Sequence, residues 1–268
     1  MNVAAKATAS TSARSSTPGA DDLTLEKSTG YARARIGLMI PSSNRLSEPQ
    51  FRHFLPDDVG VHVTRLQMTG RHAKPLAPLL EDVERAAGAL GDARCDLIVF
   101  HCTANSMEHG PEGEQKLLDA VRRGSGAQAM STAQAVVEAL RASGIRRMVL
   151  VSPYQQASNG HEIAYLSALG FETLHDVALN VPPSDGYLSV APSRWCEIVR
   201  ANLRTAADGY FLSCTNTTQI DAITTLEAEL GKPVVNSNQA TIWASLKRIT
   251  GKLGAMPAIP ALGSLMNR

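Results

Sequence analysis

The octapeptides VFHCTANS at residues 99–106 and FLSCTNTT at residues 211–218 decide the fold of this chain. Each is an apolar run that ends in a cysteine followed by small hydroxyl and amide side chains. This pattern is typical of a buried strand that carries a reactive side chain at its carboxyl end. Because Cys102 and Cys214 lie in different halves of the chain, we expect two similar α/β halves that place both cysteines at one cleft.

Outward from these segments, apolar runs of strand length alternate with stretches of helical periodicity. Strands are predicted at 36–41, 61–68, 95–102, 147–151, 171–177, 209–214 and 232–236. Helices are predicted from 47, at 76–90, 112–123, 131–143, 159–169, 193–207, 220–230 and 239–250. A repeated strand-loop-helix unit favours parallel strands joined by right-handed crossovers.

The domain organisation follows from this alternation. We expect a disordered tail at 1–30, a first α/β half at 31–130 to which the C-terminal helix can also belong, a second half at 131–250, and a C-terminal tail at 251–268. The N-terminal stretch has no apolar core and contains Asp21 and Asp22, so a secretory signal does not fit. A cytoplasmic setting with reduced thiols is therefore expected.

Composition excludes several classes of function. The 268 residues carry 26 basic and 25 acidic side chains without a basic block, which disfavours nucleic-acid and membrane-surface partners. The longest apolar runs are far shorter than the roughly 20 residues of a membrane span. No metal-ligand spacing, phosphate-binding glycine loop or G-x-S-x-G motif occurs, so we expect no metal, no nucleotide cofactor and no serine hydrolase.

The cysteines are the predicted catalytic residues. A thiol becomes a useful nucleophile or base only when oriented amides or a cation lower its pKa. Cys102 and Cys214 both precede a polar run that leads toward a helix, where backbone N–H groups can gather around sulfur. Cys95 and Cys196 are expected to pack as small apolar side chains. His101 should face away from the thiol, because neighbouring side chains of a strand alternate.

Neutral hydrogen-bond donors collect at the predicted strand ends and suit a bound carboxylate. The alternative is ordinary loop capping, since the same residue types favour turns. The candidate substrate-binding residues are Asn44, Thr103, Asn105, Tyr154, Thr215 and Asn216, with Thr217 beside them.

Four motifs carry a family resemblance: PSSN at 41–44, HCT at 101–103, SPY at 152–154 and SCTN at 213–216. They resemble the maleate cis-trans isomerase branch of the aspartate/glutamate racemase superfamily, which also includes arylmalonate decarboxylases. The likeness extends over about residues 35–251 and includes MSTA at 130–133 and VVNSNQA at 234–240.

The resemblance implies an α/β fold of two pseudo-symmetric, four-stranded, parallel Rossmann-like domains, with the active site between them and no cofactor. It also implies that Cys102 is the nucleophile and Cys214 the proton donor, and that Asn44 and Tyr154 hold substrate carboxylates.

The chain departs from the family in two places. T-A-N-S follows His101-Cys102 where the family often has T-S-G-S after the cysteine, so the pocket around Cys102 is expected to be shaped for something other than maleate. A further family asparagine has only Asn180 as a candidate.

Four functions remain open. The first is cis-trans isomerisation of a small carboxylate or dicarboxylate through a Cys102 adduct, and the second is racemisation with Cys102 and Cys214 as an acid-base pair. A decarboxylase is the third, although that branch carries glycine at the first cysteine position. The fourth is a carboxylate-binding protein without turnover. A homodimer is the expected assembly.

Overall fold

The computed structural model describes residues 32–268, which contain two four-stranded sheets, so the predicted N-terminal tail lies outside the described residues. All pairings are parallel, and the strand orders are β2-β1-β3-β4 and β6-β5-β7-β8. The first sheet contains β1 (Ala34–Pro41), β2 (Val59–Leu66), β3 (Leu97–Phe100) and β4 (Gln128–Ser131); the second contains β5 (Arg147–Ser152), β6 (Glu172–Ala178), β7 (Gly209–Leu212) and β8 (Val234–Asn236). Adding four to each strand number of the first order gives the second order, so the two sheets have the same topology. This confirms the predicted pseudo-symmetric α/β fold.

The first sheet is covered on both faces, as expected for parallel strands that read as continuous apolar runs. Ile36 and Leu38 of β1 belong to a core cluster that includes Phe51, whereas Met39 joins a second cluster with Leu79. Successive strand residues point to opposite faces, so one strand supplies both clusters. The cluster around Ile36 continues into the second sheet, and the two halves therefore share one core.

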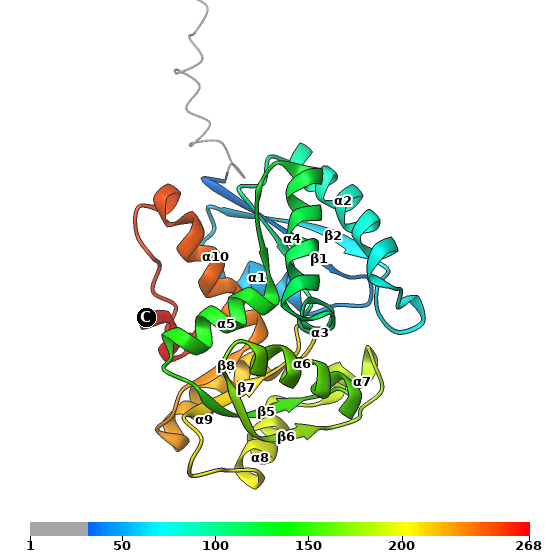
Figure 1. Cartoon of the computed structure of the whole chain (residues 1–268). Coiled ribbons are helices and arrows are strands. Elements are labelled where there is room, and N and C mark those ends of the chain that lie inside the picture. Colours follow the sequence, from blue (N-terminus) through cyan, green and yellow to red (C-terminus); the bar gives the residue numbers. More distant parts are fainter. Residues whose placement is uncertain (1–31) are drawn as a thin grey trace, which may run out of the picture. The chain divides into compact units, whose positions relative to one another are not determined.

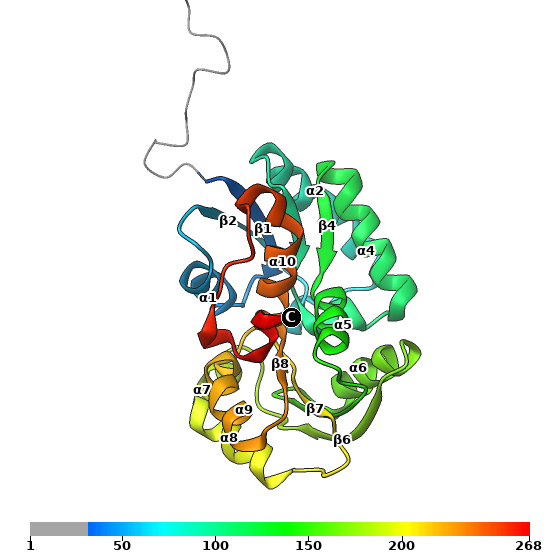
Figure 2. The same cartoon turned by 90° about the vertical axis from the view of Figure 1, so that its left-hand side faces the viewer.

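The helices divide between these faces (Figures 1 and 2). α2 (Leu76–Asp92) and α4 (Gly110–Ser125) pack on each other and on one face of the first sheet. α1 (Ser47–Phe54) packs on β2 from the other side, and α10 (Ser237–Leu253) contacts α1, β1 and β3. The C-terminal helix thus leaves the second sheet, where its strand β8 ends, and covers the first.

The remaining helices surround the second sheet and the junction. α5 (Thr132–Ala142) packs along α10 and reaches β8, while α6 (Gln156–Ala168) packs on β6 and on the short α3 (Thr103–Met107). The others are α7 (Asp185–Ser189), α8 (Pro192–Ala201) and α9 (Ile223–Leu230). Ser131 caps α5 through a hydrogen bond from the Gln134 N–H, as its sequence position suggests.

Several elements differ from the prediction, among them the short helix α3, which was not predicted. Strand β4 was not predicted, because its sequence QAMS is too short to show a periodicity. α7 lies in a polar segment without helical pattern. The helix predicted at 193–207 ends at Ala201, since Asn202 leaves helical geometry and its side chain donates back to the Ile198 carbonyl. In the region predicted as a C-terminal tail, Leu262, Leu265 and Met266 are buried in short 3-10 turns.

Within residues 32–268, no helix is both long enough and apolar enough to cross a bilayer. The same part of the chain contains no group of three or more His, Cys, Asp or Glu side chains placed to hold a metal ion.

Candidate active site

The carboxyl ends of the central strands of both sheets meet at one cavity of about 320 Å³. Asn44 follows β1, Cys102 follows β3, Tyr154 follows β5 and Cys214 follows β7, and all four line this cavity. Ligand sites in open α/β sheets lie at such carboxyl edges, where loops from neighbouring strands converge. The structure therefore brings the two predicted catalytic cysteines into one site.

Cys102 lies in the extended residue that precedes α3 and is almost fully buried. Its Sγ–H donates to Asn105 Oδ1 over 3.2 Å. Burial raises the pKa of this thiol to about 12, and nearby acidic groups, including Cys214, Glu162 and Glu108, act in the same direction. A hydrogen bond from the Asn105 backbone opposes the rise without cancelling it.

Cys214 has a φ of 137°, a backbone conformation that residues other than glycine rarely adopt. Its N–H donates to Ser237 Oγ over 3.2 Å, and the Asn216 N–H donates to its sulfur over 3.3 Å. Burial raises the pKa of Cys214 to about 12, although the Tyr154 hydroxyl and the backbone N–H donors lower it. The expected donors are thus present at both sulfurs, but burial outweighs them and the pKa of both thiols lies above its ordinary value.

Asn44 connects the loop after β1 to the loop that follows Cys214. Its Nδ2 donates to Ser47 Oγ over 2.9 Å and to Thr215 Oγ1 over 3.1 Å, while its Oδ1 accepts the N–H groups of Leu46 and Ser47. Asn44 is 1% exposed yet lines the cavity. Its side chain therefore both caps the loop, as the alternative interpretation holds, and contributes to the site wall.

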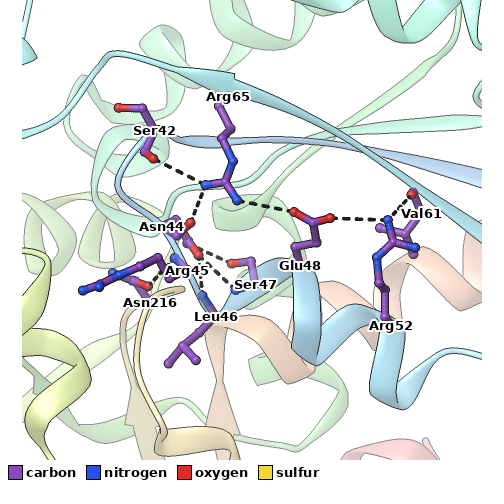
Figure 3. Close-up of polar contacts among 10 residues, drawn as sticks. All are labelled: Ser42, Asn44, Arg45, Leu46, Ser47, Glu48, Arg52, Val61, Arg65 and Asn216. Carbon is purple, nitrogen blue, oxygen red and sulfur yellow. Dashed lines mark hydrogen bonds and ion pairs between the residues drawn. The ribbon is translucent and has the colours of Figure 1, made fainter.

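A network of hydrogen bonds and ion pairs holds the loop after β1 in place (Figure 3). Arg65 of β2 donates to the backbone carbonyl of Asn44 and, over 3.3 Å, to Glu48 of α1. The Arg45 N–H donates to Asn216 Oδ1 over 2.9 Å. The loop after β1 thereby holds Asn216, a residue of the second half, in position at the cavity.

Thr103 and Thr215 take different positions. Thr215 lines the cavity, as do Asn105 and Asn216. Thr103 is fully buried behind the lining, where its hydroxyl donates to Ser237 Oγ over 2.9 Å. The Thr217 hydroxyl, also buried, donates to Gln219.

A model of arylmalonate decarboxylases matches residues 36–259. The chain belongs to the arylmalonate decarboxylase family. The predicted resemblance is confirmed, because curated relatives include both enzymes that it names.

The curated relatives of this family member include maleate isomerases. The enzyme from Geobacillus stearothermophilus is 28% identical over 247 residues, which cover 87% of this chain and 97% of the relative. The enzyme from Nocardia farcinica is 29% identical over 244 residues, covering 87% and 96%. The arylmalonate decarboxylase from Bordetella bronchiseptica is 28% identical over 234 residues, covering 87% and 96%.

Solved structures of the family share the fold. A glycine-to-cysteine mutant of arylmalonate decarboxylase with associated sulfate has a TM-score of 0.78 at 25% identity, covering 87% of this chain and all of the other. A cysteine-to-serine mutant of Nocardia farcinica maleate cis-trans isomerase, with a covalently bound succinylcysteine intermediate, has a TM-score of 0.75 at 28% identity, covering 87% and 98%.

Three residues of this family member lie outside the cavity lining: His101, Cys95 and Cys196. His101 is fully buried between Thr132 and Asn238, each 2.9 Å from a ring nitrogen, and burial lowers its pKa to about 4. Cys95 and Cys196 are buried outside the cavity lining. Asn180, the candidate for a further family asparagine, also lies outside this lining and donates to the Ala178 carbonyl.

Sequence reasoning did not identify Glu162, a fully buried residue of α6. The Ser213 hydroxyl donates to its Oε1 over 2.9 Å, and its Oε2 has no hydrogen-bond partner within residues 32–268. Burial raises the pKa of this carboxyl to about 8. When it is ionised, this carboxylate raises the pKa of both cysteines. A single glutamate within a helical pattern carries no signal of burial, so the sequence offered no way to find it.

Tyr187 and Glu108 also line the cavity and were not predicted. The Tyr187 ring meets the Tyr154 ring edge-on at 5.6 Å between centroids, and burial raises the pKa of both phenols. Tyr187 lies in α7, in a segment that shows no periodicity. Glu108 follows α3 six residues after Cys102, a proximity visible in the sequence once Cys102 is assigned to the site.

Proposed function

We propose that the protein catalyses cis-trans isomerisation of a small unsaturated acid of the maleate type through a covalent adduct at Cys102. The observation that carries this proposal is that Cys102 and Cys214, from equivalent positions in the two halves, line a single cavity. Relatives named maleate isomerases, and a relative's structure with a succinylcysteine intermediate, support it.

The adduct mechanism needs one nucleophile and one proton donor. Cys102 Sγ loses its proton to solvent and attacks one alkene carbon, and the electron pair of the double bond moves to the other carbon, next to a carboxylate. Cys214 S–H protonates that carbon, which leaves a single bond about which the substrate rotates. Cys214 then removes a proton, the bond to Cys102 breaks, and the trans double bond forms without net oxidation or reduction.

The surroundings of Cys214 match the role of a proton donor. Cys214 receives hydrogen bonds from the Tyr154 hydroxyl and from the Asn216 N–H, which stabilise its thiolate after proton transfer. The exposed Glu108 in the lining shows that the cavity reaches solvent, where Cys102 can release its proton. Burial keeps both thiols protonated at rest, which preserves Cys214 as an acid.

Decarboxylation is the second candidate because the family includes arylmalonate decarboxylases. That branch carries glycine at the first cysteine position, and the presence of Cys102 favours isomerisation.

The test is incubation with maleate, an arylmalonate and amino acids, following the alkene signals by NMR, carbon dioxide release and optical rotation together. A trans alkene formed without carbon dioxide supports the proposal. Carbon dioxide from the arylmalonate alone, or a change in optical rotation with an amino acid alone, would replace it by decarboxylation or racemisation.

The homodimer and the cytoplasmic location stay predictions. Light scattering of the purified chain checks the first, and fractionation of the source cells checks the second.

A further inference from the structure

The cavity wall beside Cys102 is formed by a chain of hydrogen bonds. Cys102 Sγ–H donates to Asn105 Oδ1 over 3.2 Å, and Asn105 Nδ2 donates to Glu108 Oε2 over 3.2 Å. The backbone carbonyl of Met68 lies 3.5 Å from the same Nδ2. All four residues line the cavity.

These contacts determine how the Asn105 amide is oriented. A carboxylate and a backbone carbonyl can only accept hydrogen bonds, so the NH₂ group must face Glu108 and Met68. The amide oxygen must then face Cys102. Asn105 was predicted to bind a substrate carboxylate, but its N–H donors are used by the protein. The side chains of Asn105 and Glu108 therefore present acceptors to a ligand on the Cys102 side.

Charge makes this side less suitable for an anion. Glu108 lies in the lining, and no Lys or Arg occurs among the described residues that line the cavity. The nearby Arg45 is paired with Asp185 outside the lining. His161 also lines the cavity, but it is not a fixed cation as Lys or Arg would be. A carboxylate placed beside Glu108 would therefore meet a like charge without a Lys or Arg counter-charge in the described lining.

The Cys214 side has the opposite character. The Thr215 hydroxyl oxygen accepts from Asn44, which leaves its own O–H for a ligand. The side-chain amide oxygen of Asn216 accepts from the Arg45 N–H, which leaves the NH₂ group of the same amide for a ligand. Neutral donors suit a carboxylate group of the substrate. The buried Glu162 also lies near Cys214, but burial raises its pKa to about 8, so at neutral pH it is mostly protonated and adds little negative charge there.

We propose that the substrate is asymmetric, with one carboxylate bound on the Cys214 side and an uncharged hydrogen-bond donor, such as a carboxamide, facing Glu108. This inference rests on the proposed function and names its substrate class: a half-amide of a cis-unsaturated diacid in preference to the diacid. Glu108 is then the residue that determines specificity.

Binding is measured with saturated analogues, so that it does not depend on turnover. Calorimetry compares succinate with its monoamide on the wild type, on Glu108→Gln and on Glu112→Gln. Glu112 is an exposed glutamate of α4 outside the cavity lining and provides a matched loss of charge. Glu108→Ala is a second variant, and thermal unfolding verifies that each protein is folded.

We expect the wild type to bind the monoamide at least about tenfold more tightly than succinate, a preference that both Glu108 variants reduce about tenfold and Glu112→Gln leaves unchanged. A wild type that binds succinate more tightly, or a preference that survives in both Glu108 variants, overturns the inference.

Parallel assays of maleate and its monoamide separate this inference from the proposed function. If the analogues show the expected preference but neither alkene isomerises, the ligand class stands and the isomerase proposal fails. If both alkenes isomerise while the wild type prefers the diacid, the isomerase proposal stands and the inference fails.

Discussion

The hydroxyl of Thr103 donates a hydrogen bond to the hydroxyl oxygen of Ser237 over 2.9 Å, and both residues are fully buried. The same Ser237 oxygen accepts the N–H of Cys214 over 3.2 Å. One oxygen at the start of α10 thus joins the residue after Cys102 to the strained backbone of Cys214. The relative position of the two cysteines depends on this contact.

Ser237→Ala should disturb the site more than the fold. It leaves two buried donors, the Thr103 hydroxyl and the Cys214 N–H, without an acceptor, and we expect a loss of about 1–3 kcal/mol in the free energy of unfolding. We expect kcat/KM to fall about tenfold or more, because the geometry of Cys214 relaxes. Urea unfolding and steady-state kinetics measure both.

The matched control is Ser245→Ala on the same helix. The Ser245 hydroxyl is buried and has no hydrogen-bond partner in the described part of the chain, so its removal should leave stability and activity within experimental error or raise stability slightly. Equal losses in both variants would show that the Ser237 contact has no special role.

The two cysteines should have separable roles. Cys102→Ala removes the attacking sulfur and should abolish turnover, whereas Cys214→Ser should still form an adduct at Cys102 that turns over about 10²–10⁴-fold more slowly. Mass spectrometry of the intact protein after incubation with substrate detects the adduct. An adduct found on Cys214 in the Cys102→Ala variant would reverse the assignment.

Tyr154→Phe should raise the pKa of Cys214 further. The Tyr154 hydroxyl lowers this pKa by a hydrogen bond to the sulfur, and its loss should slow alkylation of Cys214 at a given pH by about tenfold. The rate is read by peptide mass mapping. Tyr187→Phe, which removes the hydroxyl of the neighbouring ring, should change this rate less, and the hypothesis fails if the two variants behave alike.

Glu162→Gln should change how stability depends on pH. The pKa of Glu162 is raised by burial to about 8 from 4.5, so between these values the unfolded carboxyl is ionised while the native one stays protonated. Ionisation then favours unfolding, and wild-type stability falls by about 1.4 kcal/mol per pH unit through this group, levelling above its native pKa. The glutamine variant lacks this contribution.

The comparison is made by urea unfolding at pH 6.5 and 7.5, where histidine titration contributes equally to both proteins. The stability of Glu162→Gln relative to wild type should increase by about 1 kcal/mol between these values. A constant difference would mean that Glu162 is already ionised in the native state.

The local sequence pattern was sufficient to predict most of the fold and the main residues of the site. β1 and β3 are continuous apolar runs, and the break after each run places Asn44 and Cys102 at a carboxyl end, so parallel topology brings them to one edge. Strand β4 was not predicted because four residues are too few to show a periodicity. Tyr187 was not predicted as a site residue because the sequence of α7 has no helical pattern.

The sequence by itself determined the α/β alternation, the duplicated cysteine strands and the family, because these depend on residue order and on periodicities of a few residues. The tertiary structure alone decided the protonation of the thiols, the orientation of the Asn105 amide and the burial of Glu162. The physical reason is that a pKa and a hydrogen-bond partner depend on which groups surround a side chain. For Cys102 those groups come from both halves of the chain.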